Sequence, residues 1–321
     1  MKGALVLLAL SLTAACDRSE TKPAAAVSAS AAPAVVPSGS AAPRPKSKAE
    51  TPVEPEETSP LKLTSISGQS DGSLIGETSG GDRVRVILAT QAAPLAPEAP
   101  TAWAAVAGLV APDARVPTDL RLIPLAELAH AAKGPRAKRA VRDHARVLAD
   151  GTVTAALLHL PKEKLRRVDL GDASDGNITG RWETKLMTTE APKDDDARLL
   201  ASYQSLLAVD YLVENLIRGP VLFDEGAGRI LGVEDNDVFS AKGLDGRVGD
   251  PLARLSRHLH WSKRLVDALR ALGREKLEAA LRSPRGTLLL TPKQVEEVLA
   301  RRDALVRTAL RRGEQRALTL P

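Results

Sequence analysis

The sequence predicts an α+β domain, with a mostly antiparallel sheet in its N-terminal half and a helical second half that contains a small hairpin. Residues 83–87 alternate polar and apolar side chains, which is typical of a strand with one buried face. Apolar residues recur at helical spacing over 197–217. Two short apolar runs, 221–223 and 229–233, flank an Asp-Glu-Gly-Ala-Gly turn and predict the hairpin.

The N-terminal half of the domain is expected to begin near Leu61, where Ser-Gly, Asp-Gly and Gly-Gly pairs mark turns between short strands. Prolines at 94, 97 and 100 then interrupt the chain, and Thr101 is a suitable cap for the helix that follows. The further elements expected in this half are a helix over 101–110, a strand over 120–123, a helix over 125–132, a basic surface segment over 133–146 and a central strand over 151–160.

The second half is expected to hold a long helix over 197–217, which stops at Gly219-Pro220. Three amphipathic helices are expected after the hairpin, over 251–272, 275–281 and 292–312. His258 and His260 would lie on different faces of the first of these, because residues two apart on a helix do not face each other. We therefore interpret them as surface and groove residues.

The N-terminus has the layout of a signal peptide. Lys2 precedes a short apolar run over 4–12, which is followed by Thr-Ala-Ala-Cys at 13–16. A membrane span needs about 20 apolar residues, so this run is too short to cross a bilayer. The arrangement resembles the bacterial lipobox and implies cleavage after residue 15 and lipidation of Cys16. The alternative is an ordinary secretory signal that leaves a free cysteine.

Residues 16–60 are predicted to form a disordered tether, because the segment is rich in Ala, Pro and Ser and cannot bury enough apolar surface to fold. Cys16 is the only cysteine of the 321 residues, so the domain behind the tether can form no internal disulfide. The expected location is the cell membrane, with the domain exported, on the periplasmic side in a Gram-negative cell. The net charge of +5 is too small to argue for nucleic acid as a partner.

One segment carries chemical information. It contains Asp210-Tyr211-Leu212, then Asn215 and Arg218, then the hairpin, and then an acidic cluster over 234–237. This order resembles the catalytic core of atypical kinases: the secretory-pathway Golgi casein kinases, the HipA-like kinases and the phosphatidylinositol kinases. In those families a "DYLxxNxDRxxxN" segment leads through two short strands to an "(I/V)DN" motif, whose aspartate binds Mg²⁺.

The resemblance implies a two-lobed kinase-like domain over 61–321, with an N-lobe of about 61–165 and a C-lobe of about 166–321. It implies Asn215 and Arg218 as vestigial catalytic residues and Asp235 as the metal ligand. Asp237 belongs to the same oxygen-rich cluster, a donor set that hard cations accept. The alternative for this cluster is a turn that follows a strand. For Asp210 and Arg218, the alternative is a structural ion pair or helix cap.

Several residues that phosphoryl transfer requires are missing from the sequence. No lysine lies between Lys62 and Lys133, so the N-terminal sheet offers no lysine for the phosphates. The helix expected over 101–107 carries no acid, and Ile217 occupies the position of the catalytic aspartate. Residual turnover would need substitutes such as Arg83 or Arg85.

The leading hypothesis is therefore a membrane-tethered lipoprotein whose kinase-like domain no longer transfers phosphate and serves as a binding or scaffolding module. Its expected partners are the membrane, through Cys16, and an unidentified envelope protein; no cofactor is expected. Two alternatives stay open. The chain could be an active kinase that uses ATP with Mg²⁺ or Mn²⁺ on exported substrates, or an envelope lipoprotein with no nucleotide role.

Overall fold

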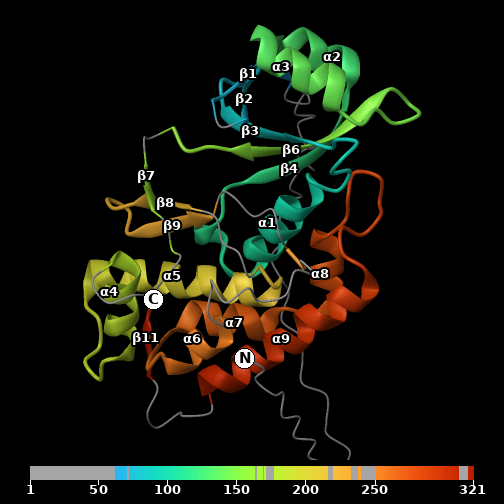
Figure 1. Cartoon of the computed structure of the whole chain (residues 1–321). Helices are drawn as coiled ribbons and strands as arrows, with labels where there is room; N and C mark the ends of the chain where they lie inside the picture. The colour runs from blue at the N-terminus through green and yellow to red at the C-terminus, as the bar shows by residue number, and fades with distance from the viewer. Residues whose placement is uncertain are drawn as a thin grey trace, which may run out of the picture. The chain divides into compact units, whose positions relative to one another are not determined.

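The structure is a computed structural model, which describes residues 62–70, 72–162, 165–168, 170, 177–215, 220–232, 238–239, 251–310 and 317–321. It has the predicted α+β architecture, with a sheet in the first half and helices in the second (Figure 1). None of the helices within these residues is both long enough and apolar enough to span a membrane.

A six-stranded sheet dominates the first half. Its strand order is β4-β6-β3-β2-β1-β5, and neighbours are antiparallel except for β5, which runs parallel to β1. The strands are β1 (Leu63–Gly68), β2 (Leu74–Thr78), β3 (Arg83–Leu88), β4 (Thr118–Pro124), β5 (Ala132–Lys133) and β6 (Thr152–His159). The predicted alternation is confirmed in β3, and the predicted central strand is β6, which pairs with β3 on one side and β4 on the other.

The two faces of the sheet pack against different parts of the chain. Val84, Val86 and Leu88 of β3 lie in a core with α2 (Leu125–Ala131) and α3 (Gly134–Arg139), which cover the outer face. The basic segment therefore is helical and contributes Ala137 to this core. On the inner face, Ala156 and Leu158 of β6 pack against Leu231 of the hairpin.

Helix α1 (Glu98–Val110) joins the sheet to the helical half. It contacts β4 and β6 on one side and α5, α7 and α8 on the other, and Figure 1 shows it between the two halves. The expected start at Thr101 is wrong by three residues, because Pro100 is tolerated in the first turn, where the backbone N–H needs no helical partner. Thr101 is not the cap; its hydroxyl donates to the Pro97 carbonyl at 2.7 Å.

The helical half is built around α5 (Asp194–Leu212), whose buried side chains include Tyr203 and Leu206. The prediction that this helix continues to 217 is wrong, because Glu214 takes a positive φ of 51°, which no α-helix accommodates. The other helices of this half are α4 (Ile178–Met187), which the sequence analysis missed, α6 (Pro251–Arg257), α7 (Lys263–Ala271), α8 (Arg274–Ala280) and α9 (Pro292–Leu310).

The predicted hairpin is confirmed as β8 (Val221–Asp224) and β9 (Arg229–Gly232), and β7 (Arg166–Val168) adds a third strand beside β8. Asp224 fixes the turn because its carboxylate accepts the Ala227 N–H at 3.0 Å and pairs with the Arg229 guanidinium at 2.9 Å. Gly228 has a positive φ of 58°, a conformation that favours glycine.

The helix expected over 251–272 is broken in the middle. Residues His260–Ser262 form β10, which pairs in parallel with β11 (Ala317–Leu320). The Ser262 hydroxyl then caps α7 by accepting the Leu265 N–H at 3.2 Å. His258 and His260 are both buried, so their interpretation as surface and groove residues is wrong.

Candidate functional site

The described part of the predicted site lies directly after α5. Asn215 is only 1% exposed, and its backbone N–H donates to the Asp210 carbonyl at 2.8 Å. Its side-chain amide donates to Asp210 Oδ1 at 3.1 Å. The turn at Glu214 thus folds Asn215 back against the end of the helix and buries it at the start of the segment that leads to the hairpin.

Asp210 also receives a hydrogen bond from the first half of the domain. The Trp103 indole Nε1–H, on α1, donates to Asp210 Oδ1 at 2.9 Å, and both side chains are buried. A buried carboxylate needs such donors, since its desolvation is otherwise costly. These hydrogen bonds hold the Asp210 carboxylate in place. The alternative of a structural ion pair with Arg218 stays a prediction, because Arg218 lies outside the described residues.

The two ends of the predicted site approach each other around the hairpin. Phe239, two residues after the acidic cluster, donates its backbone N–H to the Val213 carbonyl at 2.9 Å. The Arg301 guanidinium carbon lies 5.4 Å from the centre of the Phe239 ring. Asp235 and Asp237 lie outside the described residues, so their role as metal ligands stays a prediction. Within the described residues, no group of three or more His, Cys, Asp or Glu side chains is arranged to hold a metal ion.

The inner face of the sheet meets the hairpin through an apolar layer. Ala156, Leu158 and Leu231 are buried there, and Ile87 and Leu222 are partly buried against them. The cations nearest in sequence on this face of β3 are Arg83 and Arg85.

The described residues do not supply the lysine and acid pair that holds nucleotide phosphates in kinases. The face of α1 that is buried contains Ala102, Trp103 and Val106, and no acid. Glu98, at the first turn of α1, is the acid of this helix, and its partial burial raises the pKa of its carboxyl. Among the described residues, β3 and the buried face of α1 thus offer arginines but no lysine and acid pair of this kind.

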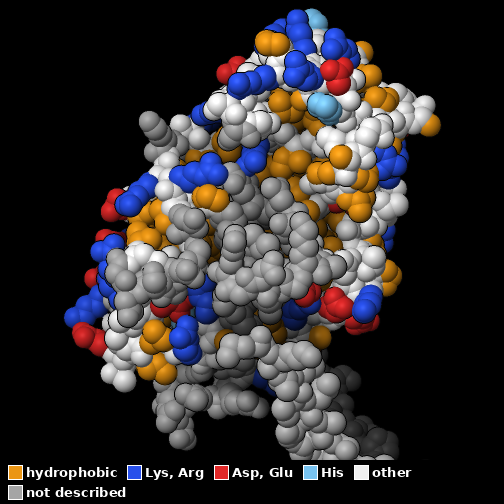
Figure 2. Space-filling view, in the orientation of Figure 1, with side chains coloured by type: hydrophobic (Ala, Val, Ile, Leu, Met, Phe, Trp, Pro, Cys, Tyr) orange, Lys and Arg blue, Asp and Glu red, His pale blue; other side chains and the backbone are white. Residues whose placement is uncertain are grey.

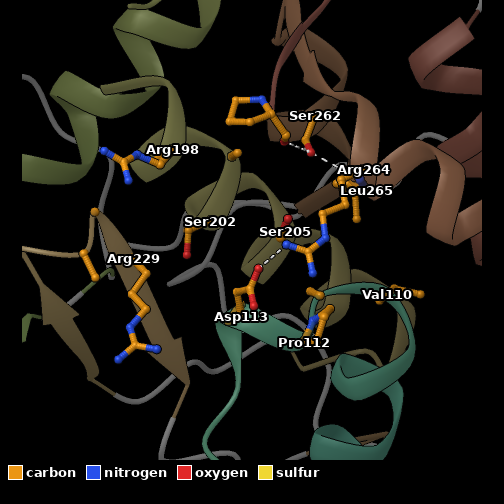
Figure 3. A pocket seen from close by; sticks show the side chains of 16 residues that line it. Val110, Pro112, Asp113, Arg198, Ser202, Ser205, Arg229, Ser262, Arg264 and Leu265 are labelled. Atoms are coloured by element: carbon orange, nitrogen blue, oxygen red, sulfur yellow. Dashed lines mark hydrogen bonds and ion pairs between the residues drawn. The ribbon is translucent and has the colours of Figure 1, made fainter. Parts of the chain in front are cut away.

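A separate hollow of about 280 Å³ lies behind the hairpin, between α1, α5 and α7 (Figure 3). Three arginines line it, but each has an aspartate partner: Arg198 pairs with Asp195, Arg229 with Asp224, and Arg264 with Asp113. Its positive charge is thus largely balanced. No pattern in the sequence indicates this hollow, because its lining comes from five segments that lie far apart along the chain.

A buried polar network lies deeper in the helical half and was also missed by the sequence analysis. The Tyr203 hydroxyl and the Arg254 Nε–H donate to Glu183 Oε1 at 2.7 and 3.1 Å, and His258 Nε2 lies 3.0 Å from Glu183 Oε2. Gln204 Nε2 lies 3.1 Å from His258 Nδ1. These side chains are buried, and their hydrogen bonds join α4, α5, α6 and the residue that follows α6.

Electrostatics in this network are dominated by one carboxylate. Burial alone would raise the pKa of Glu183, but the hydrogen bond and charge of His258, with Tyr203 and Arg254, outweigh it and lower the pKa to about 2. Burial, and then the charge of Glu183, raise the pKa of the Tyr203 hydroxyl. The network thus contains an ionised glutamate and a neutral tyrosine at physiological pH.

The sheet order, the position of α1 between β3 and β4, and the hairpin after α5 together define a kinase-like fold, as the motif resemblance implied. No protein-family profile and no curated protein sequence matches the chain.

The solved structures with a similar fold include two of a Golgi casein kinase and one of hydra Fam20. A Golgi casein kinase with Mn/ADP bound is 12% identical, covers 79% of this chain and 74% of its own, and has a TM-score of 0.53. A second Golgi casein kinase structure is 13% identical over 81% and 76% of the two chains, with a TM-score of 0.56. The hydra Fam20 structure with sugar is 14% identical over 79% and 87%, with a TM-score of 0.53. At these identities the similarity concerns the fold.

Proposed function

We propose that this chain is an exported, membrane-tethered lipoprotein whose kinase-like domain has lost phosphoryl transfer and acts as a binding or scaffolding module. The observation that carries the proposal is a kinase-like fold in which the charged residues of phosphoryl transfer are replaced. Arginines stand on β3, the buried face of α1 lacks an acid, and Ile217 occupies the position of the catalytic aspartate in the resemblance.

These replacements remove the groups that position and stabilise a transferring phosphoryl group. A lysine on the phosphates and an aspartate at the acceptor hydroxyl act by placing charge where it develops in the transition state, and each such group contributes several kcal/mol. Such a domain retains surfaces for binding without the means to accelerate the reaction.

The decisive experiment incubates the purified chain with ATP and Mg²⁺ or Mn²⁺ and measures phosphate release and transfer to a general acceptor protein. We expect no turnover above that of a heat-denatured sample. A thermal shift with ADP or ATP, measured in parallel, separates nucleotide binding from catalysis. Turnover that disappears in Asp235→Ala would establish the active-kinase alternative and reject the proposal. The absence of any nucleotide-dependent shift would favour an envelope lipoprotein with no nucleotide role.

The tether is tested separately. Growth with labelled palmitate should label the wild-type chain, and the label should be lost in Cys16→Ser, because the thioether that carries the lipid forms on this sulfur. The wild type should fractionate with membranes. A wild type without label would replace the lipid anchor by an ordinary cleaved secretory signal, and the domain would then be a soluble exported module.

A further inference from the structure

The outer end of the sheet half carries a concentrated positive charge, which we call the basic cap: residues 133–146, comprising α3 and the π-helical turn Ala140–His144. One acid, Asp143, lies among its cations. Figure 2 shows Lys, Arg and His side chains gathered over this end of the molecule. The cations, all exposed, are Lys133, Arg136, Lys138, Arg139, Arg142 and Arg146.

Little of this charge is balanced by the described residues. Arg142 pairs with Asp143, and the Arg136 guanidinium donates to the backbone carbonyl of Gln69 at 3.0 Å. No described acid forms an ion pair with Lys138 or Arg139. The arginines of the hollow behind the hairpin differ in this respect, since each of them has an aspartate partner.

The cap is indented where it meets the β1–β2 turn. A hollow of about 350 Å³ there is lined by Arg136, Arg139 and His144 on one side and by Gly68 and Gly72 on the other. The close approach depends on Gly68, because a Cβ at this position would lie 2.6 Å from the Arg136 Cβ. Two guanidinium groups beside a shallow hollow suit the tetrahedral oxygens of a phosphate group.

Exposed apolar side chains flank the cap. Val147, which follows its last residue, is 43% exposed, and Leu95 is 61% exposed. The segment before Leu95 is joined to the cap by hydrogen bonds from the Arg146 N–H to the Ala89 carbonyl at 2.8 Å and from the Gln91 N–H to the His144 carbonyl at 3.2 Å. Cations beside exposed apolar residues are typical of surfaces that lie in a membrane interface, where both types find partners.

The chain also enters the folded domain at this end. β1 begins at Leu63, whose backbone N–H donates to Glu127 Oε1 of α2 at 3.3 Å, and β1 then runs under α3 to Gly68. The segment that precedes β1 in the sequence is the proposed membrane tether. If the partner is a membrane, the basic cap and the proposed tether belong to the same end of the domain. A soluble polyanion as partner would not explain why the two lie together.

We propose that the basic cap docks the domain on an anionic phospholipid surface, with lipid phosphates bound at Arg136 and Arg139 and with Leu95 and Val147 at the interface. The proposal is independent of the kinase-like site. It concerns the same membrane as the proposed lipid anchor, but it is tested without that anchor. The docking proposal and the anchor proposal can therefore be rejected separately.

The test uses the full chain with Cys16→Ser, so that no acyl chain contributes, and measures co-sedimentation with vesicles. The vesicles contain three parts phosphatidylcholine to one part phosphatidylglycerol, or phosphatidylcholine alone. The test variant carries Lys138→Gln, Arg139→Gln and Arg142→Gln, three exposed positions without a role in the core. Each cation near an anionic surface contributes about fivefold to binding, so we expect the variant to bind the anionic vesicles on the order of tenfold to a hundredfold more weakly.

The matched control removes the same charge from the helical half, with Lys193→Gln, Lys263→Gln and Lys293→Gln, all of them exposed. The control variant should bind the anionic vesicles as strongly as the Cys16→Ser parent does. None of the three proteins should bind vesicles of phosphatidylcholine alone. Thermal unfolding of both variants shows that they are folded. Equal binding by parent and cap variant, or an equal loss in the control, overturns the proposal. Release from vesicles by millimolar inorganic phosphate at constant ionic strength also overturns it, because the cap would then be a site for soluble phosphate.

Discussion

At the scale of single residues, Glu183 is a charged side chain that the fold must stabilise away from water. Its carboxylate is buried, yet hydrogen bonds and charges from Tyr203, Arg254 and His258 keep it ionised. A buried ion pair stabilises a fold little more than an apolar pair of similar size would, but removing one of its partners is strongly destabilising. Removing one member leaves the others buried without their counter-charge.

Glu183→Gln should therefore destabilise the domain by on the order of 3 kcal/mol, because the Arg254 charge remains buried and loses its partner. Urea unfolding at neutral pH measures the change in the free energy of unfolding. Glu190→Gln, at an exposed position with only a long-range pair to Lys193, is the control and should change it by less than about 0.5 kcal/mol. Equal stability of the two variants would contradict the structural role assigned to the network.

The same carboxylate predicts a dependence of stability on pH. Its pKa falls from 4.5, the ordinary value, to about 2 in the folded chain. A group with a lowered folded pKa stabilises the fold above its unfolded pKa, and that contribution is lost as the pH falls from about 4.5 towards about 2. The urea midpoint of the wild type should thus drop more steeply over this interval than that of Glu183→Gln. Parallel pH profiles would show that the folded pKa is not lowered.

At the scale of elements, the contact of β1 with α3 depends on one glycine. A Cβ at Gly68 would lie 2.6 Å from the Arg136 Cβ and 3.3 Å from the Ala137 backbone nitrogen, and neither atom is the far end of a flexible side chain. Substitution therefore requires α3 to move away from the sheet. α3 can pack this close to β1 only because residue 68 has no side chain.

Gly68→Ala should destabilise the domain by about 1–3 kcal/mol, the usual cost of overpacking. Gly226→Ala is the control, since its added Cβ would meet only Asp224 Oδ1 at 3.8 Å, an ordinary van der Waals distance. Thermal unfolding of both variants measures the difference. A Gly68→Ala protein as stable as the control would mean that α3 can shift at no cost.

The sequence predicts a helix or strand correctly where the pattern that defines it involves residues close together in the chain. The alternation in β3 and the turn between β8 and β9 involve residues close in sequence, and both elements were found. The break at β10 was missed because Leu255, Leu259 and Val266 continue the helical spacing across it. Only the capping by Ser262 and the partner strand β11, far along the chain, end the helix there.

The site could be predicted in part for the same reason. Asn215 follows from a motif within one segment, and the structure places it, buried, against Asp210. The contact of Trp103 with Asp210 spans 107 residues, and that of Glu183 with His258 spans 75, so no pattern within a window reveals either. Such pairs depend on how helices cross, which the apolar periodicity of each helix does not specify.

At the scale of the whole molecule, the hydrogen bond from Trp103 to Asp210 connects the two halves of the domain. Trp103 lies on α1, which packs against the sheet, and Asp210 lies in the last turn of the central helix α5. The bond is made to a buried carboxylate, and hydrogen bonds to charged groups are worth about 1.5–3 kcal/mol. It thus contributes more to the union of the halves than a neutral contact would.

Trp103→Phe keeps an aromatic ring and removes the indole donor. Trp182→Phe is the matched control, because Trp182 is also buried but makes ring contacts, with centroid distances of 5.3 Å to Tyr203 and 5.8 Å to Phe223. The free energy of unfolding should fall by about 1.5–3 kcal/mol more in Trp103→Phe than in the control. Equal losses in the two variants would assign the stabilisation to ring packing alone.

The pairing of β10 with β11 has a consequence for the order in which the chain can assemble during synthesis. The Thr319 hydroxyl lies 2.8 Å from His260 Nδ1, and the Ser262 hydroxyl donates to the Pro321 carbonyl at 2.6 Å. The core of the outer sheet face, by contrast, is complete once residue 157 has left the ribosome. The β10–β11 pair therefore forms only after residues 317–320 have been synthesised, whereas the core of the outer sheet face needs no residue beyond 157.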